Sequence, residues 1–148
     1  MPIQNLSGAG FEIQVIALPT IPFGVKVKSF AGDADPLDIA QLTYADFTMG
    51  LNGDLILSKR PTPITISLRT IPGTDEDIAM ERLFDANRVA ANKVSYLDIV
   101  TMTFLYPSGM RKVLTDGAII GGTPIVGMNA QGMLKSNKWD FVFGGKSV

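Results

Sequence analysis

The chain of 148 residues contains neither cysteine nor histidine. The absence of cysteine excludes a disulfide framework and thiolate chemistry. The absence of histidine removes the commonest general base, proton shuttle and metal ligand. A serine nucleophile would therefore need a different base. Neither a Ser-x-x-Lys motif nor a Gly-x-Ser-x-Gly motif occurs, so the sequence offers no support for nucleophilic catalysis.

Long apolar runs and a strong net charge are also missing. No apolar run approaches the roughly 20 residues of a membrane span, and the first residues lack the charged region and apolar run of a signal peptide, so we expect none. A net charge of -1 gives no overall attraction to nucleic acid or to anionic membranes. The length is typical of one domain with a proper core.

The charge that is present is unevenly distributed along the chain. Acidic residues dominate residues 12–54, whereas basic residues favour the C-terminal part. These basic residues are Arg111, Lys112, Lys135, Lys138 and Lys146. Complementary patches of this kind suit self-association.

The sequence pattern predicts a helix in one segment, residues 74–91. Thr74 can cap it, and the next three residues are acidic, which the helix dipole favours in a first turn. Apolar residues follow at spacings of three and four, so they share one face. We expect the helix to pack on the outside of a sheet through Met80, Leu83 and Phe84.

The rest of the chain alternates between apolar and polar residues, as half-buried strands do. Asn52-Gly53 is a strong hairpin signal between two such segments. Strands are predicted at 11–18, 25–30, 42–50, 54–59, 64–70, 97–106, 110–114 and 132–143, the last with Trp139, Phe141 and Phe143 on one face. The fold class is therefore mainly β (α+β), a sandwich or barrel with one helix outside.

Three segments do not follow this pattern. The glycine-rich residues 117–132 could form a bulged strand or a long loop. Residues 1–10 and 144–148 are expected to be a flexible N-terminal arm and a flexible C-terminal tail of a single domain, 1–148.

The acidic loop at residues 31–41 is the candidate metal site. Asp33, Asp35 and Asp38 cluster there, but a calcium loop needs glycine and glutamate at its sixth and twelfth positions, which are Asp38 and Tyr44 here. A solvated loop is the better interpretation. Residues 121–127 are glycine-rich but match neither a dinucleotide fingerprint nor a phosphate loop. We expect no metal and no cofactor.

Four segments, in this order, resemble the tail tube proteins of contractile-tailed bacteriophages. They are residues 52–58 (NGDLILS), 63–68 (PITISL), 75–87 (DEDIAMERLFDAN) and 138–146 (KWDFVFGGK). In that family a hairpin with an acidic, glycine-containing turn leads to an alternating strand, and then to a helix of similar pattern. The matching pieces span about half of the chain.

The resemblance implies a structural virion protein with no catalytic group. Tail tube proteins are small β-sandwiches that assemble as hexameric rings, and the rings stack into the tube that conducts phage DNA into the host. The implied partners are further copies of the chain and the tail sheath, baseplate and terminator proteins. DNA would pass without specific binding, and the protein would reside in the virion tail after assembly in the host cytoplasm.

The resemblance also suggests where copies would meet. The hairpin at 42–59 is expected to line the channel or reach a neighbouring subunit, with Thr43, Asp46, Thr48 and Asp54 as candidates. The N-terminal arm and the acidic loop are expected to join stacked rings, with Asp33, Asp35 and Asp38 as candidates.

Several alternatives remain open at this stage. A tube of a phage-related secretion or injection machine would share the fold and the ring, as would the tube of a long flexible tail. A β-barrel ligand-binding protein or a carboxylate-based enzyme would belong to a different class, because carboxylate pairs form in space and not in sequence. Particle mass separates these classes, since the latter two need no assembly.

Overall fold

The computed structural model of the chain describes residues 7–30, 32 and 34–147. Within them one helix accompanies nine strands, which confirms the mainly β class. The elements are β1 Glu12–Leu18, β2 Ile21–Val27, β3 Leu37–Ile39, β4 Ala45–Met49, β5 Leu55–Lys59, β6 Ile64–Thr70, α1 Asp75–Asn87, β7 Ile99–Leu105, β8 Arg111–Gly122 and β9 Asn137–Ser147.

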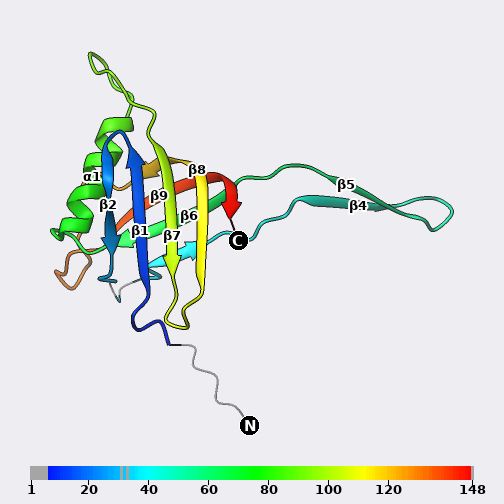
Figure 1. The fold of residues 1–148 in the computed structure, drawn as a ribbon, viewed down its shortest axis with the longest axis horizontal. Helices are drawn as coiled ribbons and strands as arrows, with labels where there is room; N and C mark the ends of the chain where they lie inside the picture. Colours follow the sequence, from blue (N-terminus) through cyan, green and yellow to red (C-terminus); the bar gives the residue numbers. More distant parts are fainter. Residues whose placement is uncertain (1–6, 31, 33, 148) are drawn as a thin grey trace, which may run out of the picture.

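Seven strands form one antiparallel sheet in the order β2-β1-β7-β8-β9-β6-β3. Figure 1 shows β2, β1, β7 and β8 side by side, with β9 and β6 crossing behind them. The pairing of β8 with β9 shifts register between Ile119 and Gly121, and such irregularities bend a sheet. The two layers of the expected sandwich are therefore halves of a single sheet that folds over itself.

The core lies between these two layers. Alternate residues of β9 point inward as their spacing predicts, and Trp139, Phe141 and Phe143 are buried. They pack in one cluster with apolar side chains from both layers. Ile66 and Leu68 come from β6, and residues of β1, β2, β7, β8 and α1 complete the cluster.

Helix α1 begins where the sequence predicts it. The side chain of Thr74 caps it by accepting a hydrogen bond from the backbone N–H of Asp77 at 3.3 Å. Met80 and Leu83 are fully buried in the core, and Phe84 is half-buried with its ring 5.7 Å from that of Trp139. The helix therefore contributes to the core of the folded sheet.

The C-terminal end of the helix corrects the prediction, because α1 ends at Asn87 and not at residue 91. The amide of Asn87 donates to the carbonyl of Leu83 at 2.8 Å and to a carboxylate oxygen of Asp98 at 2.6 Å. Arg88 then takes an extended backbone conformation. A side-chain bond to a distant residue thus stops the helix before its local pattern ends.

The predicted acidic loop contains a short strand. β3 pairs with β6, with Leu37 opposite Leu68 and Ile39 opposite Ile66. Asp35 lies before this strand and Asp38 within it, while Asp33 lies outside the described residues. Pairing with β3 gives hydrogen-bond partners to backbone groups of β6 that would otherwise lie unpaired at the edge of the sheet.

The prediction of a flexible tail from residue 144 is wrong for residues 144–147. They continue β9 and pair with β8, with Gly145 opposite Thr115 and Lys146 opposite Leu114. β8 is 12 residues long and provides the backbone partners for this extension. The glycine-rich segment 117–132 contains both of the structures predicted as alternatives. Residues 117–122 belong to the bulged strand β8, and a loop follows from residue 123.

Two glycines of β8 make room for the aromatic side chains of β9. A Cβ atom at Gly117 would overlap the ring of Phe143, and one at Gly122 would overlap the indole of Trp139. Glycine is used here for close approach and not for its backbone freedom.

Gly117→Ala is therefore expected to lower the free energy of unfolding by roughly 1–3 kcal/mol, the usual cost of overpacking a core. Gly121→Ala is the matched control, since the nearest atom to its added Cβ is Asp140 Oδ2 at 3.7 Å, an ordinary contact. Urea unfolding of the two variants measures the difference. Equal stability of both would contradict this account of Gly117.

Candidate functional site

The most prominent surface feature is a two-stranded arm, residues 42–60, which projects away from the folded sheet (Figure 1). Its strands β4 and β5 pair only with each other, from Ala45 opposite Lys59 to Met49 opposite Leu55. The backbone N–H of Gly50 donates to the carbonyl of Asp54 at 2.7 Å, and Gly53 adopts a positive φ of 86°. The hairpin that Asn52-Gly53 predicts is confirmed.

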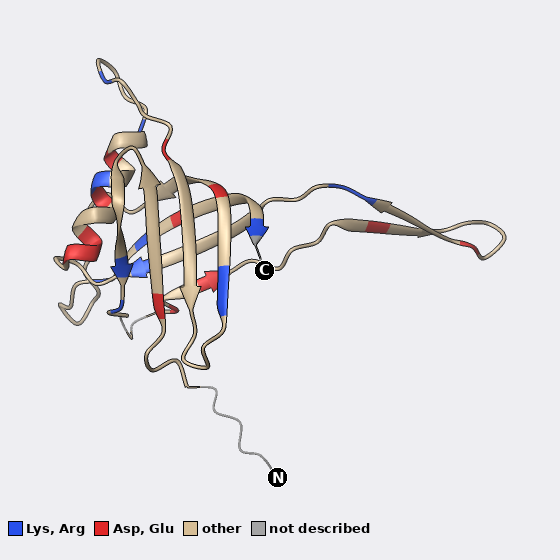
Figure 2. Ribbon diagram, viewed as in Figure 1, with Lys and Arg blue, Asp and Glu red and all other residues tan. Residues whose placement is uncertain are grey.

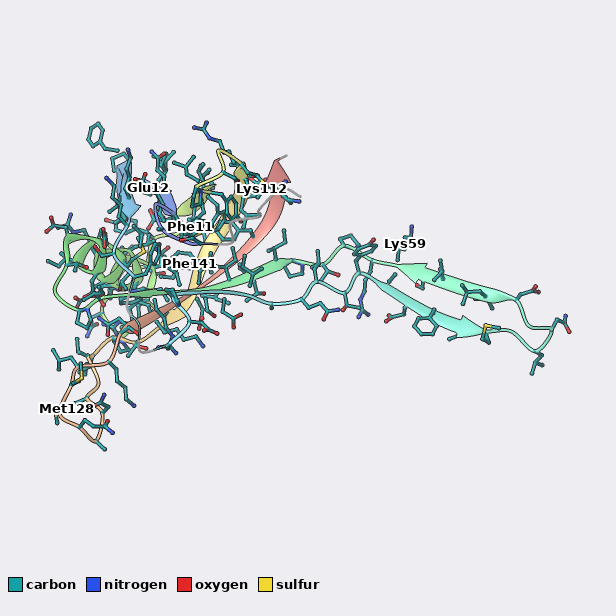
Figure 3. The ribbon with its side chains drawn as sticks, turned by 90° about the horizontal axis from the view of Figure 1, so that it is seen from below. Phe11, Glu12, Lys59, Lys112, Met128 and Phe141 are labelled. Carbon is teal, nitrogen blue, oxygen red and sulfur yellow. The ribbon has the colours of Figure 1, made fainter. Side chains whose placement is uncertain are left out.

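The two strands of the arm are joined to each other at its root. The backbone N–H of Arg60 donates to the carbonyl of Tyr44 at 2.9 Å. The hydroxyl of Thr62 donates to the carbonyl of Thr43 at 3.3 Å. Beyond this root, the two strands extend freely from the body (Figure 3). These two bonds keep the strands paired where the arm leaves the body.

One face of the arm is apolar and uncovered. The register places Phe47 opposite Leu57 and Met49 opposite Leu55, and side chains directly opposite each other share a face. Their exposed fractions are 72%, 57%, 64% and 61%, respectively. Burying one such side chain contributes about 1.5–3 kcal/mol. Four of them on one projecting hairpin form a surface suited to a partner.

The opposite face is more polar. Asp46 lies opposite Ser58, and Thr48 lies opposite Ile56. The guanidinium of Arg60 lies 3.6 Å from Asp46, with both side chains largely exposed. An exposed pair of this kind contributes about 0–1 kcal/mol, so it does little to hold the arm together.

The structure brings one set of predicted residues together and leaves the other elsewhere. Thr43, Asp46, Thr48 and Asp54 all lie exposed on the arm. Asp35 and Asp38 lie at the edge strand β3 on the body. Their roles between subunits and between rings stay predictions. Figure 2 shows few charges on the arm, acidic residues along α1 and basic residues at the start of β8.

Sequence reasoning missed the apolar face of the arm. It named the polar residues of the hairpin as the candidates and did not identify the face that Phe47 and Met49 share. Within a single chain both are exposed. The signal that could have found the face was the alternation of apolar residues in both strands about the Asn52-Gly53 turn.

A buried polar network ties α1 to the folded sheet. One carboxylate oxygen of Asp77 accepts hydrogen bonds from the hydroxyl of Thr70 at 2.7 Å and the amide of Asn137 at 2.8 Å. Its other oxygen accepts from the backbone N–H of Gly73 at 3.4 Å. The indole N–H of Trp139 donates to the hydroxyl of Thr70 at 2.9 Å. The network is buried, so its hydrogen bonds stabilise the packing of α1 on the sheet.

Asp77→Ala is expected to lower the free energy of unfolding by roughly 3 kcal/mol, because it leaves buried donors of Thr70 and Asn137 without an acceptor. Asp75→Ala is the matched control, since Asp75 is exposed in the same turn. It should cost about 0.3–1 kcal/mol through the helix dipole alone. Thermal or urea unfolding compares them, and a similar loss in both would contradict the role of the network.

A second network joins the two ends of the loop between α1 and β7, at Asn87 and Asp98. Asp98 is buried, and its carboxylate accepts from the backbone N–H of Thr20 at 3.0 Å, the hydroxyl of Thr20 at 2.7 Å and the amide of Asn87. Its own backbone N–H donates to the side-chain oxygen of Asn87 at 2.9 Å. Between these two ends, the loop exposes Val89, Val94 and Leu97.

Neither a metal centre nor a membrane helix emerges from these residues. Across residues 7–30, 32 and 34–147, no group of three or more Asp or Glu is placed to hold a metal ion. No helix in the same ranges is long and apolar enough to cross a membrane.

Comparison with known proteins adds a family to this geometry. The model of the family described as tail fiber protein gp32 matches residues 4–147. The chain belongs to this family. It is therefore a bacteriophage tail structural protein, and the predicted resemblance to phage tail proteins is confirmed at that level. The family also speaks against the enzyme alternative. No curated protein matches the chain.

Solved structures extend the comparison to the fold. One similar chain comes from the cryo-EM structure of the anti-feeding prophage (AFP) baseplate, 6-fold symmetrised. The TM-score is 0.56 at 10% sequence identity, over 99% of this chain and 96% of that chain. At this identity the likeness concerns the fold alone. The match nevertheless runs over nearly the whole length of both chains.

Proposed function

We propose that this tail protein is the tube subunit, which forms hexameric rings that stack into the channel for phage DNA. The observation that carries the proposal is the projecting arm with its uncovered apolar face. The fold of a chain from a six-fold apparatus of the phage-tail type is consistent with it.

The projecting arm favours head-to-tail association between copies of the chain. Its apolar face is formed by Phe47, Met49, Leu55 and Leu57, and it extends beyond the chain's own body. A contact between the arm of one copy and the body of the next uses two different surfaces. Heterologous contacts of this type close into rings or continue as filaments. A tube made of stacked rings needs both outcomes.

The hairpin is expected to contact a neighbouring subunit or to line the channel, and each face of the arm suits one of these roles. The apolar face would contact a neighbouring copy, and the face with Asp46 and Thr48 would remain in water at the channel wall. A channel for DNA must not retain phosphates, which basic walls would do. The exposed polar side of α1, with Glu81, Arg82 and Asp85, would remain available to a sheath protein outside the tube.

A second candidate is a ring subunit of the baseplate. It is favoured by the fold likeness to a chain of a baseplate structure. Such a subunit would use the same arm to close a ring but would not continue into a long tube. For the tube subunit, the proposed partners are baseplate and terminator proteins, which would bind at the two ends of the tube.

Particle mass and imaging test the proposal. Purified protein at micromolar concentration is expected to give a mass near six subunits or far above, with hollow tubes in electron micrographs. Single rings that do not elongate would favour the baseplate subunit. A strictly monomeric species across concentration and salt would overturn the proposal.

A further inference from the structure

An apolar groove lies on the body near the root of the arm. It has a volume of about 290 Å³. Residues from β3, β6, β8 and β9, from the end of β7 and from the start of the arm line it. Its apolar wall is formed by Ile39, Leu42, Ile64, Phe104, Tyr106 and Leu114. Leu42 and Ile39 are 41% and 48% exposed, so the groove is open to solvent.

Two lysines border this groove, Lys112 of β8 and Lys146 of β9. Neither forms an ion pair with any residue that the structure describes. An occupant that suits the groove would therefore place an apolar side chain against its wall and a carboxylate beside the lysines. A purely apolar occupant would leave both ammonium groups without a partner.

The tip of the arm has this chemistry. Leu51 at the turn is fully exposed, with a relative accessibility of 107%. Asp54 follows three residues later, is exposed, and makes no ion pair with a described residue. Residues 49–55 carry no basic side chain. The turn thus presents the apolar side chain of Leu51 close to the unpaired carboxylate of Asp54.

The tip cannot occupy the groove of its own chain. The groove includes Leu42 at the root, and about nine residues of extended strand, roughly 30 Å, separate Leu42 from Leu51. Figure 3 shows the free end of the arm far from the body that carries Lys112. An arm tip that fills this groove must therefore belong to another copy of the chain.

We propose that the arm tip of one copy seats in the groove of the next, with Leu51 against the apolar wall and Asp54 beside Lys112 and Lys146. The inference rests on the proposed tube function and names the contact that propagates it. The two surfaces lie at opposite ends of the same arm. Every copy can therefore donate one tip and accept another, without any self-complementary patch.

Cross-linking tests the contact directly, because the chain has no native cysteine. In the full chain, Leu51→Cys is combined with Ala40→Cys, which lies in the groove wall. The control combines Leu51→Cys with Ser95→Cys in the exposed loop between α1 and β7, which Figure 1 places away from the root of the arm. A short bis-maleimide should give a ladder of dimers, trimers and larger species for the first pair only.

Charge reversal gives a second, independent readout. Asp54→Lys is expected to weaken association about tenfold or more, measured by light scattering. Lys112→Glu with Lys146→Glu should weaken it similarly, and all three substitutions together should restore it. Restoration requires that the two sites face each other.

The outcomes separate this inference from the proposed function. Large particles without the Leu51–Ala40 ladder, or with an equal ladder in the control, would overturn the seating of the tip and leave the tube proposal standing. A monomer with neither ladder nor large particles would overturn both.

Discussion

Leu83→Asp is expected to yield unfolded or insoluble protein. The side chain of Leu83 is fully buried in the core between α1 and the folded sheet. Leucine-to-alanine changes at such positions cost about 2–5 kcal/mol, and an unpaired carboxylate in the same place adds the cost of burying a charge. Together these approach the total stability of a domain of this size. Soluble yield and circular dichroism report the result.

Arg82→Ala is the control for this variant. Arg82 precedes Leu83 in the same helix but is exposed and packs on nothing in the core. It should change the free energy of unfolding by no more than about 0.5 kcal/mol. A soluble Leu83→Asp protein with the thermal stability of the original chain would contradict the docking of α1.

The second large effect concerns the arm. The double variant Phe47→Lys and Leu57→Lys is expected to abolish association while the domain stays folded. Both residues lie opposite each other on the apolar face and outside the core, so their loss leaves the folded sheet intact. Losing two buried side chains of about 1.5–3 kcal/mol each should raise the dissociation constant roughly a hundredfold or more.

The opposite face of the arm provides a matched control. Thr48→Lys with Ser58→Lys adds the same charge to the same two strands, but on the polar face. This variant should still associate. Light scattering gives the mass and circular dichroism the fold. Assembly by the Phe47 and Leu57 variant, or equal loss of assembly in both, would contradict an interface on the apolar face.

Local sequence signals were sufficient for most of the individual elements. Thr74 and the acids after it placed the start of α1, since a cap and a dipole act within one turn. The alternation of Trp139, Phe141 and Phe143 placed the buried face of β9, because strand periodicity reports burial on one side. Asn52-Gly53 placed the hairpin for the same local reason.

Features that depend on distant partners did not show in the sequence. β3 exists because β6 offers it an edge, and residues 144–147 belong to β9 because β8 continues alongside them. The end of α1 depends on Asp98, eleven residues beyond Asn87. None of these partners lies within the few residues next to the element that depends on it.

The candidate site divides in the same way. The residues of the arm and their alternation could be read from the chain, as could the absence of histidine and cysteine. That the arm leaves the body, that its apolar face stays uncovered, and that a groove flanked by Lys112 and Lys146 lies near its root were decided by the folded sheet. Exposure and grooves are properties of packing between distant strands, whereas periodicity records only which side of an element is apolar.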